Sequence, residues 1–298
     1  MNLLVCIKVV PDIGKAKIDP ITNNLIREGL KMIINPSDLC ALKFALNIKD
    51  KAQEDVNITV ISMGPPQAED AIRETIQMGA DRGFLIMGLE FRGSDTLATS
   101  YTLSQAIKSL GNFDLVLTGD KTLDGDTGQI GPELSEHLSF NLFSFVKELS
   151  YEDGYFKATR LTKNGEEIVK SKAPLLVTAL KDSVSRPSKF SRGREVIAKN
   201  AEIKVLNAQN IELDNERIGQ AGSHTIVKEV FPPKKEEVGR KIEGDINQQV
   251  DELISILKDK GVLNWWVIIF GLLLKMLKMT LLNLVRKWWI RLKQLPKL

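Results

Sequence analysis

Leu3-Leu4-Val5-Cys6-Ile7, a short and continuously apolar run near the amino terminus, decides the fold class of this chain. Runs of this kind are typical of strands buried on both faces, as in a parallel sheet covered by helices. Similar runs follow at 57–63, 83–87 and 114–119, and each run is followed by a segment whose apolar residues recur at helical spacing. The series predicts an α/β fold with a doubly wound, mostly parallel sheet.

The segments between these strands have recognisable beginnings and ends. The first helix is expected to begin at Asn35-Pro36-Ser37-Asp38, with Ser37 or Asp38 as its N-cap. Three further helices are expected at 67–78, 96–110 and about 129–137. Residues 13–34 are rich in turn-forming residues and predict a hairpin, and residues 151–180 predict antiparallel hairpins added to the sheet.

Charge is distributed unevenly along the 298 residues, of which 43% are apolar and 27% charged. The net charge is +3, but residues 264–298 hold all four Trp and seven basic residues without one acidic residue. The remainder has 34 basic against 38 acidic residues, which argues against a nucleic-acid-binding protein. Two Cys and two His exclude a disulfide framework and a histidine or cysteine metal site, so we expect no metal.

A ligand of an open parallel sheet binds beyond the carboxyl ends of the strands. Three loops are expected there: residues 35–38, the turn after Met63, and the loop after Gly119. The last contains Asp124-Gly125-Asp126-Thr127-Gly128-Gln129-Ile130-Gly131-Pro132, whose glycines let a ligand approach the backbone at a helix N-terminus. This arrangement suits a pyrophosphate, although a capped turn without ligand stays open.

Two aspartates of this loop need separate roles, because carboxylates aimed at a phosphate would repel it. We expect either Asp124 or Asp126 to cap the following helix, and the other to bind a ribose hydroxyl or order the loop. Neither His137 nor His224 lies in a catalytic pattern, and Cys6 and Cys40 are typical of core positions. We therefore predict no catalytic side chain, and any reaction would depend on a bound cofactor.

Residues 1 to about 263 resemble the β subunit of electron transfer flavoproteins. The resemblance is carried by segments at Val5–Asp12, Ile34–Asp38, Ser62–Pro65, Ala71–Gly83 and Leu115–Leu138. It implies a nucleotide site, continuing to about Ser135, that includes Cys6, Asn35, Pro36, Ser37, Asp38, Met63, Asp124, Gly125, Asp126, Thr127, Gly128, Gln129, Ile130, Gly131, Pro132 and Glu133.

The resemblance also implies a cytoplasmic heterodimer with an α subunit that carries FAD. The stretch from Asp124 to Leu138 is most similar to electron-bifurcating members, in which a second FAD in the β site accepts hydride from NADH. Electrons then pass to ferredoxin and, through the α-subunit FAD, to a partner dehydrogenase. Two alternatives stay open: a non-bifurcating β subunit with a structural AMP, and a universal-stress-like module that binds ATP.

One departure from the family pattern concerns the basic loop at 183–194. Members that serve acyl-CoA dehydrogenases anchor a leucine in the partner, whereas Ser185–Gly193, with the sequence SRPSKFSRG, has Arg192 at that position. A guanidinium group cannot fill an apolar pocket without stranding its charge. Lys189, Phe190 and Arg192 are therefore expected to contact a flavin-dependent dehydrogenase in a different way, either a lactate-type or an acyl-CoA enzyme.

Three regions follow from these observations. Residues 1–204 are expected to form the α/β nucleotide-binding domain, and residues 205–263 an extended arm whose final helix, capped by Asp245, packs on the α subunit. Residues 264–298 place Lys275, Lys278 and Arg286 on one side of a helical wheel, which suits a membrane surface. A tail foreign to the function of the body is the interpretation that we prefer for this last region.

Overall fold

The computed structural model describes residues 1–12, 17–18, 25–26, 31–189, 192–226, 228 and 241–261. The chain divides into two compact units, Met1–Pro232 and Pro233–Leu298, and each is considered by itself. The tail at 264–298, with both of its interpretations, lies outside the described residues. Among the residues that are described, no helix has the length and apolar character needed to cross a membrane.

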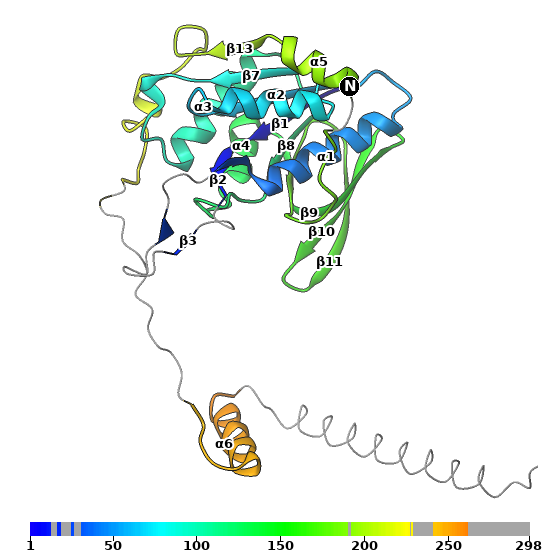
Figure 1. Ribbon diagram of the computed structural model, residues 1–298. Helices are drawn as coiled ribbons and strands as arrows, with labels where there is room; N and C mark the ends of the chain where they lie inside the picture. The colour runs from blue at the N-terminus through cyan, green and yellow to red at the C-terminus, as the bar shows by residue number, and fades with distance from the viewer. Residues whose placement is uncertain are drawn as a thin grey trace, which may run out of the picture. The chain divides into compact units, whose positions relative to one another are not determined.

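A nine-stranded sheet forms the centre of the first unit, in the order β11-β10-β9-β12-β8-β1-β6-β7-β13 (Figure 1). The bounds are β1 (Asn2–Ile7), β6 (Asn57–Met63), β7 (Arg82–Ile86), β8 (Leu115–Gly119), β9 (Asn141–Glu152), β10 (Tyr155–Thr162), β11 (Gly165–Ser171), β12 (Leu175–Ala179) and β13 (Ile203–Leu206). Seven strands from β13 to β9 are parallel, and β10 and β11 add antiparallel pairs. The predicted doubly wound sheet with added hairpins is confirmed.

Five helices cover the two faces of this sheet. Helices α1 (Pro36–Lys51), α2 (Ala68–Met78) and α5 (Arg192–Asn200) pack on one face, and α3 (Thr96–Ser109) and α4 (Ile130–Leu138) on the other. Strand β1 serves both layers, because Leu3, Val5 and Ile7 join the first core and Leu4 and Cys6 join the second. The run that predicted a strand buried on both faces therefore lies in the middle of the fold.

Two short antiparallel pairs form the excursion between β1 and α1. Strand β2 (Val9–Pro11) pairs with β5 (Met32–Ile34), and β3 (Lys17–Ile18) pairs with β4 (Leu25–Ile26). These pairs agree with the hairpin predicted for residues 13–34.

The N-cap of α1 differs from the prediction, whereas the N-cap of α6 (Ile246–Asp259) agrees with it. Asn35 is the N-cap residue of α1, so the prediction that Ser37 or Asp38 caps this helix is wrong. Pro36 fills the first helical position, and this moves the beginning of the helix toward the amino terminus. In the second unit, Asp245 is the N-cap of α6, as predicted. Its side chain forms a capping box with Gln248.

The first compact unit extends beyond the boundary expected at residue 204. Strand β13 adds a parallel edge beside β7, and Ile211 and Ile218 are buried against α3. Residues 205–226 therefore belong to the compact body, whereas we expected them to begin the arm. The apolar residues after β13 follow neither a helical nor a strand period. They lie largely in loops, which bury single residues such as Ile211 and Ile218.

Helices α2 and α5 hold each other through two arginines. Arg73 of α2 donates to three carbonyls at the end of α5, the shortest being that of Ala201 at 2.8 Å. Arg194 of α5 donates to the carbonyls of Ile76 and Ala80 at the end of α2. Each guanidinium donates to backbone carbonyls at the end of the neighbouring helix, where the regular helical hydrogen bonds stop. The basic loop expected at 183–194 is consequently shorter, since α5 begins at Arg192.

Candidate functional site

A cavity of about 810 Å³ opens at the carboxyl ends of β1, β6, β7 and β8. This is the edge of an open parallel sheet where ligands bind. The predicted site residues that line the cavity are Cys6, Asp38, Met63, Gly125, Thr127, Gly128, Gln129 and Ile130. Those that do not line it are Asn35, Pro36, Ser37, Asp124, Asp126, Gly131, Pro132 and Glu133.

Asn35 and Asp38 join the floor of the cavity to the glycine loop. Asp38 accepts hydrogen bonds from the backbone N–H of Lys8 at 2.7 Å and of Gly119 at 3.1 Å, which ties the ends of β1 and β8 together. The Nδ2 group of Asn35 donates to Asp38 Oδ1 and to the carbonyl of Lys121, both at 2.9 Å. The pair therefore positions the loop relative to the strand ends.

Burial controls the protonation of the two titratable groups on this floor. It raises the pKa of Asp38 to about 7, against the opposing effect of the hydrogen bonds from Asn35, Lys8 and Gly119. Burial, followed by the negative charge of Asp38, raises the pKa of the Cys6 thiol well above its usual range. A neutral buried thiol is not a nucleophile, so Cys6 contributes surface to the cavity.

Both aspartates of the glycine loop form ion pairs with lysines. Asp124 pairs with Lys8 at 2.7 Å and Asp126 with Lys121 at 2.8 Å. Neither caps α4, because its N-cap residue Gln129 makes no side-chain cap hydrogen bond, and the predicted capping role is wrong. The carboxylates order the loop instead, and their charges are directed at lysines. Neither loop aspartate is therefore directed at the N-terminus of α4, which leaves its backbone N–H groups available to an anionic ligand.

Two further residues test whether a nucleotide fits this loop. The buried Asp120 Oδ1 has no hydrogen-bond partner among the described residues, and Asp120 lines the cavity. Leaving such an atom unpaired costs about 1–3 kcal/mol, and a ligand hydroxyl or amine would satisfy it. Gly128 lines the same wall with a φ of 67°, so the backbone turns there without a side chain in the cavity. The residues present fit a phosphate- and hydroxyl-bearing ligand.

Gly131 and Glu133 lie behind this wall. A Cβ at Gly131 would overlap the side chain of Thr178, so glycine there lets α4 approach β12. The hydroxyl of Thr96 lies 3.2 Å from Glu133 Oε1 and 3.1 Å from Gln129 Oε1. Burial raises the pKa of Glu133. Gly131 and Glu133 therefore support the packing of α4 beneath the cavity.

A wall formed by residues 86–96, between β7 and α3, was missed from the sequence. Its lining members are Ile86, Met87, Gly88, Leu89, Phe91, Arg92, Gly93, Ser94, Asp95 and Thr96. The signal was present, because β7 is parallel to β6 and its following loop must reach the same edge of the sheet. Asp95, the N-cap of α3, accepts from the backbone N–H of Ala98 at 3.1 Å and marks where this wall ends.

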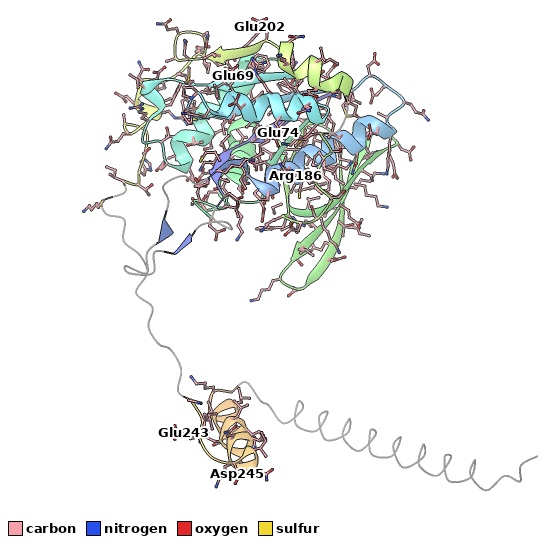
Figure 2. All side chains as sticks on the ribbon, viewed as in Figure 1. Glu69, Glu74, Arg186, Glu202, Glu243 and Asp245 are labelled. Carbon is pink, nitrogen blue, oxygen red and sulfur yellow. The ribbon has the colours of Figure 1, made fainter. Side chains whose placement is uncertain are left out.

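The basic segment expected to contact a partner is held against α2. Arg186 Nη2 lies 2.9 Å from Glu74 Oε1 of α2. Both residues are labelled in Figure 2. Lys189 Nζ lies 2.8 Å from the same oxygen, so this predicted contact residue has an ion pair within the chain. Phe190 lies outside the described residues, as does the side chain of Arg192.

The two histidines lie in different surroundings. His137 of α4 packs edge-on against Tyr101, and burial lowers its pKa. The backbone N–H of His224 donates to Asp95. In the part of the chain that the structure describes, no group of three or more His, Cys, Asp or Glu side chains could hold a metal ion.

The chain is similar to proteins of one known family over most of its length. The family model described as the electron transfer flavoprotein domain matches residues 22–210. The chain is 38% identical over 260 residues to the electron transfer flavoprotein subunit beta of Clostridium acetobutylicum, which covers 87% of this chain and 99% of that protein. It is 38% identical over 264 residues to the caffeyl-CoA reductase-Etf complex subunit CarD of Acetobacterium woodii, covering 88% and 100%. Protein FixA of Sinorhizobium fredii is 39% identical over 245 residues, covering 80% and 85%.

Proposed function

Because the chain belongs to the electron transfer flavoprotein family as a β subunit, we propose that its cavity binds FAD and that it transfers electrons within a heterodimer with an α subunit. The observation that carries the choice of FAD is the size of the cavity. Small-molecule sites span about 300–1,000 Å³, and a cavity of about 810 Å³ is large for AMP alone. The wall at 86–96 supplies the additional length and apolar surface.

We assign the ADP half of the ligand to the glycine loop and the start of α4. Backbone N–H groups there would hold the pyrophosphate, and Asp120 would accept a hydrogen bond from a hydroxyl or amine. Lys8 and Lys121 keep the loop aspartates turned away from the phosphates. Apolar side chains such as Met87 and Phe91 would pack against the larger ring system and exclude water from it.

When bound, FAD supplies the redox chemistry, which in the bifurcating type means accepting hydride from NADH. The proposal requires no side chain of this protein to act as an acid, base or nucleophile. Its residues position the cofactor and keep the floor of the cavity neutral or paired, as Asp38 and Cys6 do. We propose that the electrons pass to ferredoxin and, through the α-subunit FAD, to a dehydrogenase in the cytoplasm.

Two surfaces suit the partners of this reaction. Helix α6 has Val250 and Leu253 exposed within its unit, and we assign this apolar face to the α subunit. The basic segment with Arg186 and Lys189 suits an acidic surface on a flavin-dependent dehydrogenase. The relative CarD takes its name from a caffeyl-CoA reductase complex, which favours an enzyme of CoA thioesters over a lactate-type partner.

Nucleotide analysis of the intact complex tests this proposal. The full chain, purified with its α subunit, should release two FAD per heterodimer on denaturation. One FAD and one AMP would instead show the non-bifurcating type, and ATP would support a module of the universal-stress kind. One FAD without any second nucleotide would refute nucleotide binding by this cavity.

A pair of glycine variants locates the site within the chain. Gly128 beside the cavity and Gly154 in the β9–β10 turn have φ values of 67° and 75°, so alanine imposes similar backbone strain on both. A Cβ at Gly154 would meet no atom within 4 Å. We expect Gly128→Ala to lower the second nucleotide and Gly154→Ala to leave it at the wild-type level. Equal contents in both variants would place the ligand elsewhere.

A further inference from the structure

The wall at 86–96 is held in place by a segment more than a hundred residues later in the chain. Asp95 Oδ2 accepts hydrogen bonds from the backbone N–H of His224 at 2.8 Å, the backbone N–H of Thr225 at 3.0 Å and the Thr225 hydroxyl at 3.1 Å. The backbone N–H of Asp95 donates to Ser223 Oγ at 2.8 Å, and this hydroxyl lies 3.0 Å from the carbonyl of Gly93. We call Asp95 and residues 223–225 the clasp.

Close backbone packing extends the clasp along the wall and along α3. A Cβ at Gly219 would overlap the carbonyl of Glu90, so these two backbones touch directly. Nearer the middle of α3, the Tyr101 hydroxyl accepts from the backbone N–H of Asp214 at 3.0 Å. The Arg217 guanidinium lies 3.9 Å from the centre of the Tyr101 ring. The segment is therefore fixed to α3 before it reaches the cavity wall.

The two oxygens of Asp95 have separate tasks. Oδ1 caps α3 through Ala98, and Oδ2 makes the clasp. Burial alone would raise the pKa of Asp95, but the hydrogen bonds from Ala98, Thr225 and His224 outweigh burial and lower the pKa. The carboxylate is thus ionised at neutral pH and accepts charge-assisted hydrogen bonds, which are the stronger kind.

We propose that the clasp holds the wall at 86–96 in the arrangement that binds nucleotide, which makes Asp95 a positioning residue for the ligand. The inference rests on the proposed nucleotide-binding function of the cavity. The wall contains Gly88 and Gly93, so fixing its backbone costs a large conformational entropy. A ligand that had to fix the wall on binding would bear this cost and bind more weakly. The clasp supplies that order before the ligand arrives.

Asp95→Asn separates the clasp from the cap. Asparagine is a good N-cap and keeps an oxygen for Ala98, but its NH₂ group cannot accept from the N–H groups of His224 and Thr225. Asp81→Asn is the matched control, because Asp81 accepts from the backbone N–H of Ile58 at 2.8 Å beside the opposite end of β7, away from the cavity. Ser223→Ala is a second test, since it weakens the clasp and leaves the cap of α3 untouched.

Release of the second nucleotide from the intact αβ complex measures the effect. FAD is followed by its fluorescence after dilution, or AMP by chromatography of the filtrate, and amide exchange of residues 88–96 is measured in parallel. We expect about tenfold faster release and faster exchange for Asp95→Asn, since a hydrogen bond to a charged group contributes about that factor or more. Ser223→Ala should shift both in the same direction, and Asp81→Asn should match the wild type.

Three outcomes would overturn the inference. Wild-type release from both clasp variants would show that the wall does not depend on the clasp. Equal acceleration by Asp95→Asn and Asp81→Asn would show a general loss of stability. A wild-type complex with no nucleotide beyond the α-subunit FAD would refute the proposed function, and the inference with it. If Asp95→Asn fails to fold, Ser223→Ala decides the question.

Discussion

Asp38 should make the folded chain less stable as the pH rises toward 7. Its pKa is raised from 3.8 to about 7 by burial, so the folded state prefers the protonated form. The stability from this preference is complete below 3.8 and is lost as the pH rises through about 7. At 1.36 kcal/mol per pKa unit the whole effect is about 4 kcal/mol, of which about 2.5 kcal/mol is lost between pH 5 and 8.

Urea unfolding of wild type and Asp38→Asn between pH 5 and 8 measures this loss. Circular dichroism at 222 nm reports the body, whereas tryptophan fluorescence would not, because all four Trp lie at 265–289. Asparagine does not ionise, so the difference between the two proteins isolates Asp38. The difference is needed because burial raises the pKa of Glu133, with the same sign of effect, and lowers that of His137, with the opposite sign.

Two results would refute this reasoning. Stability curves that stay parallel from pH 5 to 8 would show that Asp38 does not titrate in this range. A wild type that gains stability with pH relative to the variant would show that the hydrogen bonds from Lys8, Gly119 and Asn35 outweigh burial. The sign of the difference therefore decides between desolvation and hydrogen bonding as the dominant influence.

The remaining predictions concern α4, α5 and the partner surface. Gly131→Ala should lower stability by about 1–3 kcal/mol and reduce nucleotide content, because its Cβ overlaps Thr178 and displaces α4. Arg194→Ala should cost about 1–3 kcal/mol and speed amide exchange in α5, since it removes the hydrogen bond to the Ala80 carbonyl after α2 and a second donor from the Ile76 carbonyl. Arg192→Glu should weaken electron transfer to the partner dehydrogenase and leave the nucleotide content unchanged, as measured by steady-state reduction at low and high salt.

Each of these predictions has a control. Gly111→Ala, where a Cβ would meet no atom within 4 Å, should retain nucleotide, and a similar loss there would contradict the packing role of Gly131. Arg160→Ala breaks an exposed pair with Glu167 and should cost less than about 1 kcal/mol. If it costs as much as Arg194→Ala, the helix-end carbonyls are not the reason. Unaltered partner reduction by Arg192→Glu at every salt concentration would remove this residue from the partner surface.

Sequence patterns determined the strands and helices, because each of these elements is formed by residues close together in the chain. Continuous apolar runs such as Leu3–Ile7 are buried on both faces, and helical spacing located α2 and α3 within one residue of their observed ends. The glycine loop was recognisable as a candidate ligand site because its residues are neighbours in the chain. Its contact with nucleotide stays a prediction. These features depend on the period of side chains along a strand or helix, which a sequence displays directly.

Tertiary structure decided what depends on residues far apart in the chain. The carboxylate expected to cap α1 instead joins β1 to β8, because burial between two strand ends offers Asp38 two backbone N–H groups. Asp124 and Asp126 turn toward lysines, which no helix pattern indicates. The clasp pairs Asp95 with Thr225 across 130 positions. Such contacts leave no period in the sequence, since each joins particular residues and does not recur along a strand or helix.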